Sequence, residues 1–237
     1  MTSKTASGDT RIEHDFLGNV EIPGKAYWGI HAARAVENFP ITRSTVAAMP
    51  ELIVAIAHVK KAAARANRDF GLLTEAQCDA IVWAAEQLIA GRHHKEFVVD
   101  VIQGGAGTST NMNANEVIAN LALEKMGHAK GEYQYLHPND HVNASQSTND
   151  VYPTAVRLSL WFALDGLLQE MARLRESFED KAQEFAEVLK IGRTQLQDAV
   201  PMTLGQELST YATMLEEDEA RVREAKQLIE EINLGAT

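Results

Sequence analysis

The chain has 237 residues, of which 45% are hydrophobic and only 6% are aromatic, and its formal net charge is -11. This length and apolar content exclude a wholly disordered chain, and the low aromatic content favours helices over sheets. The negative charge argues against nucleic acid or an anionic membrane as a partner, and a single cysteine, Cys78, excludes an internal disulfide and a metal site built from cysteines.

The start of the chain carries no targeting segment that we recognise. Residues 1–9 are small and polar, without the apolar stretch of a secretory signal. No later run approaches the roughly 18 apolar residues that a membrane helix requires. We therefore expect a cytoplasmic protein with no membrane partner, and a disordered N-terminus over residues 1–10.

Residues 11–29 are the only region that we expect to form strands. Apolar and polar residues alternate on both sides of Gly18-Asn19, and Pro23-Gly24 follows, which is typical of a short hairpin. Helices are expected from Pro50 onward, because apolar residues recur there at helical spacing.

Two helix boundaries in this first half are marked by specific residues. Thr74 with Gln77 forms a capping-box pattern, and the helix that follows should stop at Gly91. Another helix should begin near Thr110 or Asn111 and end at Met126-Gly127. The polar residues 131–149 then predict a long ordered loop or domain junction.

Two long helices are expected in the second half. Apolar residues step by threes and fours from Val151 to about Leu189, which predicts a helix roughly 55 Å long. A similar seam follows Pro201 and continues to Ile232. Such seams call for a helical bundle, and two helices cannot cover both of them, so more chain or other subunits must supply the missing partners.

The predicted fold class is therefore mainly α. We expect a disordered segment at 1–10, a small, mostly helical domain with a short β-hairpin at 11–145, and the first two long helices of a bundle domain at 146–237. The chain ends at 233–237, where a helix cap would lead into another element, so we expect the bundle to be incomplete.

Three segments have the composition of anion-binding sites. Residues 104–107 are glycine-rich and lead into Thr108 and a helix start, which suits a carboxylate or phosphate, although the composition taken alone favours a tight turn. The run Ser147, Thr148 and Asn149 provides more capping residues than one helix start needs, yet could be only a cap. Residues 192–201 are expected to form a polar loop between the two long helices, in which Arg193 could bind a carboxylate ligand or pair with Asp198, although the loop could be only an inter-helix turn.

A fourth polar cluster contains His137, Asn139, Asp140 and His141. Two histidines could hold a metal ion, but Pro, Asn and Asp around them are more typical of a turn with solvated histidines. We assign no metal site to the chain on this pattern.

Taken together and in this order, these motifs resemble those of the aspartase/fumarase superfamily. Two further motifs support the resemblance, which covers nearly the whole chain from Arg11: residues 26–29 (Ala-Tyr-Trp-Gly) and 37–40 (Glu-Asn-Phe-Pro). Several details resemble aspartases more than class II fumarases, namely the Ser147-Thr148-Asn149 run, residues 131–136, and Gln195.

The resemblance implies a fold and an activity. The fold would have a small N-terminal domain, a central five-helix bundle and a C-terminal domain, with a homotetramer whose active sites are shared between subunits. The activity would be reversible conversion of L-aspartate to fumarate and ammonia through an enediolate, without an organic cofactor. Class II fumarase, acting on malate, and a catalytically inactive helical scaffold are the alternatives.

The resemblance also implies roles for individual residues. Substrate would be bound by these residues: Thr108, Ser147, Thr148, Asn149, Thr194 and Gln195. A second carboxylate site would involve these residues more weakly: His137, Asn139 and Asp140. The family's catalytic serine lies on a Gly-Ser-Ser loop that this sequence does not contain, so we assign no catalytic base within the chain and expect it beyond Thr237.

Overall fold

The computed structural model describes residues 10–235 as two compact units. The first contains the chain up to Ser159 together with the residues from Ile232 onward, and the second contains Leu160–Glu231. The disordered segment expected at 1–10 lies outside the described residues except for Thr10, which is the first residue of a strand.

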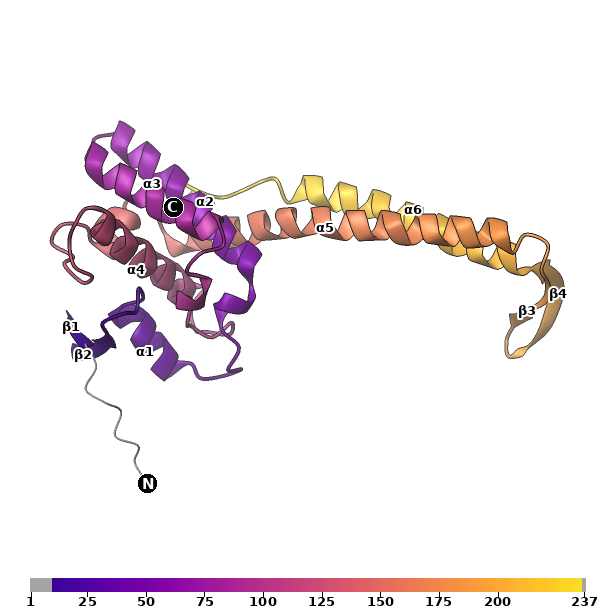
Figure 1. Cartoon of the computed structure of the whole chain (residues 1–237), viewed down its shortest axis with the longest axis horizontal. Coiled ribbons are helices and arrows are strands. Elements are labelled where there is room, and N and C mark those ends of the chain that lie inside the picture. Colours follow the sequence, from indigo (N-terminus) through magenta and orange to yellow (C-terminus); the bar gives the residue numbers. More distant parts are fainter. Residues whose placement is uncertain (1–9, 236–237) are drawn as a thin grey trace, which may run out of the picture. The chain divides into compact units, whose positions relative to one another are not determined.

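The first unit begins with an antiparallel hairpin, β1 (Thr10–Asp15) and β2 (Gly18–Pro23), in which Thr10 pairs with Pro23 and Asp15 with Gly18. This confirms the hairpin predicted from the alternating pattern. Four α-helices, two short 3-10 turns and one π-helical turn follow (Figure 1). They are α1 (Ile30–Asn38), η1 (Val46–Ala48), α2 (Pro50–Asp69), α3 (Glu75–Ile89), η2 (His94–Glu96), α4 (Thr108–Lys125) and η3 (Pro138–Val142).

Helix α4 is the centre of the first unit. Every residue from Asn113 to Leu123 is buried, and the helix packs against α1, α3 and η3. A helix that is buried on all sides must find internal partners for its polar side chains. Asn113, for example, accepts from Val98 N–H and donates to the Glu96 carbonyl.

The helix boundaries agree with the sequence in part. The Thr74–Gln77 capping box is confirmed, and α3 ends two residues before Gly91. Helix α4 starts at Thr108, two residues earlier than expected, because Gly107 in the left-handed conformation (φ 84°) ends the loop there. Helix α1 was not predicted, since it is short and only partly apolar.

The two long helices are α5 (Thr148–Glu184) and α6 (Leu204–Leu228), and in the second unit they pack as an antiparallel pair (Figure 1). Trp161 binds Glu230 near one end of the pair, and the rings of Phe178 and Tyr211 are 5.5 Å apart toward the other. Both helices are shorter at their C-termini than their apolar seams suggested.

Our expectation of a polar loop between the long helices was wrong. Residues 189–203 form a second hairpin, β3 (Leu189–Thr194) and β4 (Gln197–Thr203), so residues 11–29 are not the only strand region. Its pattern was concealed because Gly192 and Pro201 lie within the strands and the register shifts between Ile191 and Arg193.

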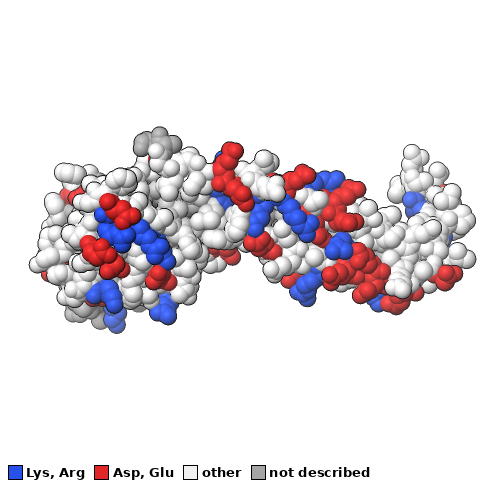
Figure 2. All heavy atoms as spheres, turned by 90° about the horizontal axis from the view of Figure 1, so that it is seen from above, with Lys and Arg blue, Asp and Glu red and all other residues white. Residues whose placement is uncertain are grey.

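The predicted need for additional helix partners agrees with the exposure of the second unit. Large apolar side chains on both long helices are about half exposed, including those of Leu160, Leu167, Leu174 and Met214. Figure 2 shows acidic and basic side chains interspersed along α5 and α6, whereas the hairpin is mostly uncharged. None of the helices within residues 10–235 is long and apolar enough to cross a membrane.

Candidate functional site

The glycine-rich loop leads directly into α4. Gly107 caps the helix without a side chain, and Gln103 completes the turn by accepting from Thr110 N–H (2.8 Å) and donating to Thr110 Oγ1 (2.8 Å). The loop therefore uses its own glutamine to fix the third residue of the helix. Thr108, at the first position of α4, is exposed to an adjoining cavity.

The start of α5 carries the Ser147-Thr148-Asn149 run. Ser147 Oγ accepts from Asn149 N–H at 3.2 Å, which is the local contact of a helix cap. Thr148 Oγ1 instead accepts from Asn111 Nδ2 at 2.9 Å. The side chain of Asn149 is exposed. The three residues thus have different surroundings: Ser147 caps the helix, Thr148 is hydrogen-bonded to α4, and Asn149 is exposed.

The contact between Asn111 and Thr148 brings together two helix starts that are far apart in sequence. Gly107 also lies against α5, since a Cβ atom on it would be 2.1 Å from Tyr152 Cγ. Helix N-termini carry unpaired N–H groups and positive partial charge. Two of them beside each other, with threonine hydroxyls at both, form a region suited to a carboxylate.

A cavity of about 670 Å³ lies next to Thr108. Its lining brings Thr108 together with all three residues of the predicted second carboxylate site: His137, Asn139 and Asp140. His137 also has a structural contact, because its Nδ1 accepts from the N–H groups of Asn139 and Asp140 at 3.1 Å and so caps η3.

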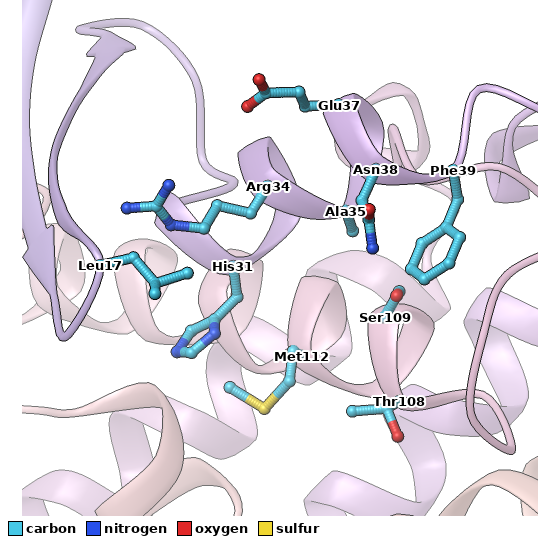
Figure 3. Close-up of a pocket in the computed structure, with 10 residues that line it drawn as sticks. All are labelled: Leu17, His31, Arg34, Ala35, Glu37, Asn38, Phe39, Thr108, Ser109 and Met112. Carbon is cyan, nitrogen blue, oxygen red and sulfur yellow. The ribbon is translucent and has the colours of Figure 1, made fainter.

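An adjoining cavity of about 630 Å³ lies between α1 and the start of α4 (Figure 3). His31 and Arg34 approach it from α1, and Thr108, Ser109 and Met112 from α4. Sequence reasoning missed His31, which lines both cavities. The only sequence signal was its position two residues after the motif at 26–29. Burial lowers the pKa of His31 below its ordinary value, which favours the neutral imidazole.

The N-terminus of α1 is held by two buried carboxyl groups. Glu116 accepts from the N–H groups of Gly29, His31 and Ala32 at 2.7–3.1 Å, and Glu13 accepts from Ile30 N–H at 2.8 Å. Burial raises the pKa of Glu116 to about 8. These contacts fix the helix that carries His31 and Arg34.

Thr194 and Gln195 belong to the second unit. Gln195 and Leu196 both have positive φ (47° and 62°) and form the two-residue turn between β3 and β4. Both predicted site residues are exposed there. Arg193 pairs with Asp198 at 2.8 Å across the hairpin, which is one of the two alternatives for this arginine. Within the first unit, Thr108 shares a cavity lining with His137, Asn139 and Asp140, whereas Ser147, Thr148 and Asn149 are not among the residues that line it.

The side chains of the described residues offer few ligands for a metal ion. Among the residues that the structure describes, no three histidine, cysteine, aspartate or glutamate side chains form a group that could hold one. The contacts around the two helix starts are hydroxyls, amides and N–H groups, which suit an anionic organic ligand.

Known proteins with similar sequences include several aspartate ammonia-lyases. Aspartate ammonia-lyase of Helicobacter pylori strain J99 is 57% identical over 227 residues, covering 96% of this chain and 48% of that protein. Aspartate ammonia-lyase of Escherichia coli strain K12 is 50% identical over 232 residues, covering 98% of this chain and 48% of that protein. The chain spans about half the length of the curated relatives it matches.

Solved structures show the same fold. A structure titled fumarate lyase:delta crystallin from Brucella melitensis superposes with a TM-score of 0.94 at 55% identity, covering 96% of this chain and 53% of that one. A class II fumarase from Schistosoma mansoni gives a TM-score of 0.89 at 37% identity, covering 97% of this chain and 48% of that one. A family model described as Lyase matches residues 18–237, so the chain belongs to this lyase family and is homologous to aspartate ammonia-lyases over most of its length.

Proposed function

We propose that the complete protein, meaning this chain continued to the length of its relatives, is an aspartate ammonia-lyase. It would convert L-aspartate reversibly to fumarate and ammonia. A base takes a proton from Cβ, the electron pair of that C–H bond forms the double bond, and the C–N bond breaks to release ammonia. The intermediate is an enediolate on the β-carboxylate, so the site must stabilise nearly two negative charges.

The observation that carries the proposal is the Asn111–Thr148 hydrogen bond, which places the starts of α4 and α5 together. Preorganised hydroxyl and N–H donors in that region suit the charge of the enediolate. The identity of 57% to an aspartate ammonia-lyase supports the choice of aspartate over malate.

Within this proposal, Thr108, Ser147, Thr148 and Thr194 hold the substrate carboxylates, and Asn149 orients the amino group. Gln195 cannot titrate, which an aspartase tolerates because ammonia leaves with less help from an acid than hydroxide does. His137, Asn139 and Asp140 form a second carboxylate site. The catalytic base comes from a segment that this sequence does not contain.

We also propose a cytoplasmic homotetramer in which the bundle helices of several subunits cover one another. The half-exposed apolar side chains of α5 and α6 support this assembly. Each active site would then contain residues from more than one subunit. Thr194 and Gln195 of one subunit would contribute to a site that also contains residues of another subunit.

The proposal is tested by assaying the complete protein with L-aspartate and with L-malate. Fumarate is followed by its ultraviolet absorbance in both assays. We expect turnover of aspartate and little turnover of malate. Turnover of malate alone would identify a fumarase, and turnover of neither would support a catalytically inactive scaffold.

A substitution tests the site itself. Thr148→Ala removes a donor to charge that grows in the transition state, so kcat/KM for aspartate should fall on the order of 100-fold. Thr148→Ser keeps the hydroxyl and should retain most activity. Thr10→Ala, which removes an exposed threonine hydroxyl from β1, is the control and should be near wild type. Unchanged kinetics in Thr148→Ala would show that this placement is wrong.

A further inference from the structure

Lys60 on α2 is completely buried, and sequence reasoning did not single it out. Its side chain is 0% exposed, although lysine is almost never fully buried without a charged partner. Its Nζ donates to two side-chain amide oxygens, Asn143 Oδ1 at 2.8 Å and Gln146 Oε1 at 3.0 Å. Both acceptors lie in the loop that leads into α5.

The contacts continue from Lys60 to the candidate site. Asn143 Oδ1, which accepts from Lys60, also accepts from Asn111 Nδ2 at 3.1 Å. The same Asn111 Nδ2 donates to Thr148 Oγ1 at 2.9 Å. Asn111 Oδ1 is buried and has no hydrogen-bond partner among the described residues. The orientation of the Asn111 amide therefore depends on its two contacts with Asn143 and Thr148.

We propose that Lys60 is a positioning residue, which acts through Asn143 and Asn111 to hold the Thr148 hydroxyl in place for the substrate carboxylate. This inference rests on the proposed function of Thr148. Lys60 Nζ donates to Asn143 Oδ1 and holds that oxygen in place. Asn111 Nδ2 donates one hydrogen to the same oxygen, which orients the Asn111 amide. Its other hydrogen is donated to Thr148 Oγ1, which orients the threonine hydroxyl. The hydroxyl hydrogen then remains free to donate to a carboxylate oxygen.

The chemistry of a buried lysine fits this role. Burial lowers the pKa of Lys60 well below its ordinary value. A neutral amine still has two N–H donors, and Lys60 has two acceptors. The hydrogen bonds to Asn143 and Gln146 therefore persist whether the nitrogen is charged or neutral.

A double-mutant cycle separates positioning from a merely structural effect. In the complete protein, Lys60→Met keeps the length of the side chain and removes its donors. We expect kcat/KM for aspartate to fall on the order of 10- to 100-fold. The loss should appear mainly in kcat, because the hydroxyl binds charge that grows in the transition state. In a Thr148→Ala background, Lys60→Met should cost almost nothing further, because the residue through which it acts is gone.

The matched control is Lys61→Met. Lys61 is the next residue on the same helix, but it is partly exposed and pairs with Glu86 at 2.7 Å. It should leave kcat/KM near wild type in both backgrounds. If Lys60→Met does not fold, Gln146→Met removes one of the lysine's two acceptors and should show a smaller loss with the same dependence on Thr148.

The outcomes are distinct. If the losses in kcat/KM of Lys60→Met and Thr148→Ala multiplied in the double variant, the inference would be overturned, since Lys60 would then act independently of Thr148. Folded Lys60→Met, or failing that Gln146→Met, with wild-type kinetics would overturn it as well. A wild-type protein that neither turns over aspartate nor binds succinate, measured by calorimetry, would instead contradict the proposed function.

Discussion

The two units of the chain differ in how they bury their side chains. In the first, α4 is enclosed on all sides, and the core includes Ile53, Ile81, Phe97 and Leu121, each at most 2% exposed. Residues 160–231 of the second unit bury only two glycines, one alanine and one glutamate: Gly192, Gly205, Ala212 and Glu219. Helices of ordinary length can enclose a core within one chain, whereas two long helices share a single interface and leave the rest of each seam uncovered.

The buried glutamate of the second unit shows how little apolar core is available there. Glu219, on α6, binds Arg175 at 3.0 Å and Arg223 at 2.9 Å. The pair with Arg175 joins α5 to α6, whereas the pair with Arg223 lies within α6, and both pairs lower the pKa of Glu219. The first unit also buries a carboxyl group, Glu116, whose burial raises its pKa although three backbone N–H groups donate to it.

The largest expected effect concerns the chain by itself. Because the second unit exposes apolar seams and the proposed mechanism takes its base from outside these residues, residues 1–237 alone should form no fumarate and should self-associate. Analytical ultracentrifugation and a fumarate assay measure both properties. Adding the second half of the protein should restore activity. Leu167→Glu with Leu174→Glu should weaken association. A well-behaved monomer would show that the seams need no partner.

A pair of glycine substitutions compares the packing of the two units. Gly107→Ala should destabilise the first unit by about 2–5 kcal/mol, because φ is +84° and the new Cβ would overlap Tyr152. Gly166→Ala, in α5, meets nothing within 4 Å and should stabilise the chain by up to about 1 kcal/mol. Urea unfolding followed by circular dichroism measures both values. A stable Gly107→Ala variant would contradict the close contact of the two helix starts.

The pH dependence of stability should differ between the units because of Glu116. Its folded pKa, about 8, is above the ordinary value of 4.5. Its stabilising contribution is therefore complete below pH 4.5 and is lost as the pH rises to about 8, at up to about 1.4 kcal/mol per pH unit. Urea unfolding at pH 5, 7 and 9 should show this decline in the wild-type chain.

Glu116→Gln removes the titrating group and should flatten the decline over this pH range. Glu219→Gln, in the second unit, is the control, and it should leave the decline between pH 5 and 9 in place because the pKa of Glu219 is lowered. An equal decline in wild type and Glu116→Gln would assign the pH dependence to other groups.

The smallest expected effect is at the tip of the second hairpin. Gln195→His should leave the stability within about 0.5 kcal/mol of wild type, because the position is exposed and histidine tolerates its positive φ. If Gln195 enters the site, the pH profile of deamination in the complete protein should gain a titration near 6.5. Leu196→His places an imidazole at the next position of the turn instead, and it should leave the pH profile of deamination unchanged. An unchanged profile in Gln195→His would remove this residue from the site.

Local sequence patterns determined the elements whose signal lies in neighbouring residues. The first hairpin follows from alternation around a Gly-Asn turn, α3 from the Thr74–Gln77 cap, and the long helices from sustained apolar steps. The second hairpin was not predicted, because both of its strands are largely exposed and contain Gly192 or Pro201. No alternation of buried and exposed residues therefore marks it in the sequence. Its existence depends on pairing between the strands, which a one-dimensional pattern does not contain.

The candidate site divides in the same way. The helix starts near Thr108 and Thr148 were predictable to within a few residues, because glycines and capping residues mark helix starts wherever they occur. That the two starts meet through Asn111, that His31 lines both cavities, and that Lys60 lies beneath Asn143 were decided only by the tertiary structure. In the sequence, Lys60 and Lys61 are adjacent lysines with nothing to distinguish them. In the structure, Lys60 is buried, whereas Lys61 is partly exposed and pairs with Glu86. Hydrogen bonds between residues that are 32 to 83 positions apart depend on which helix faces pack together, and packing is set by the whole core at once.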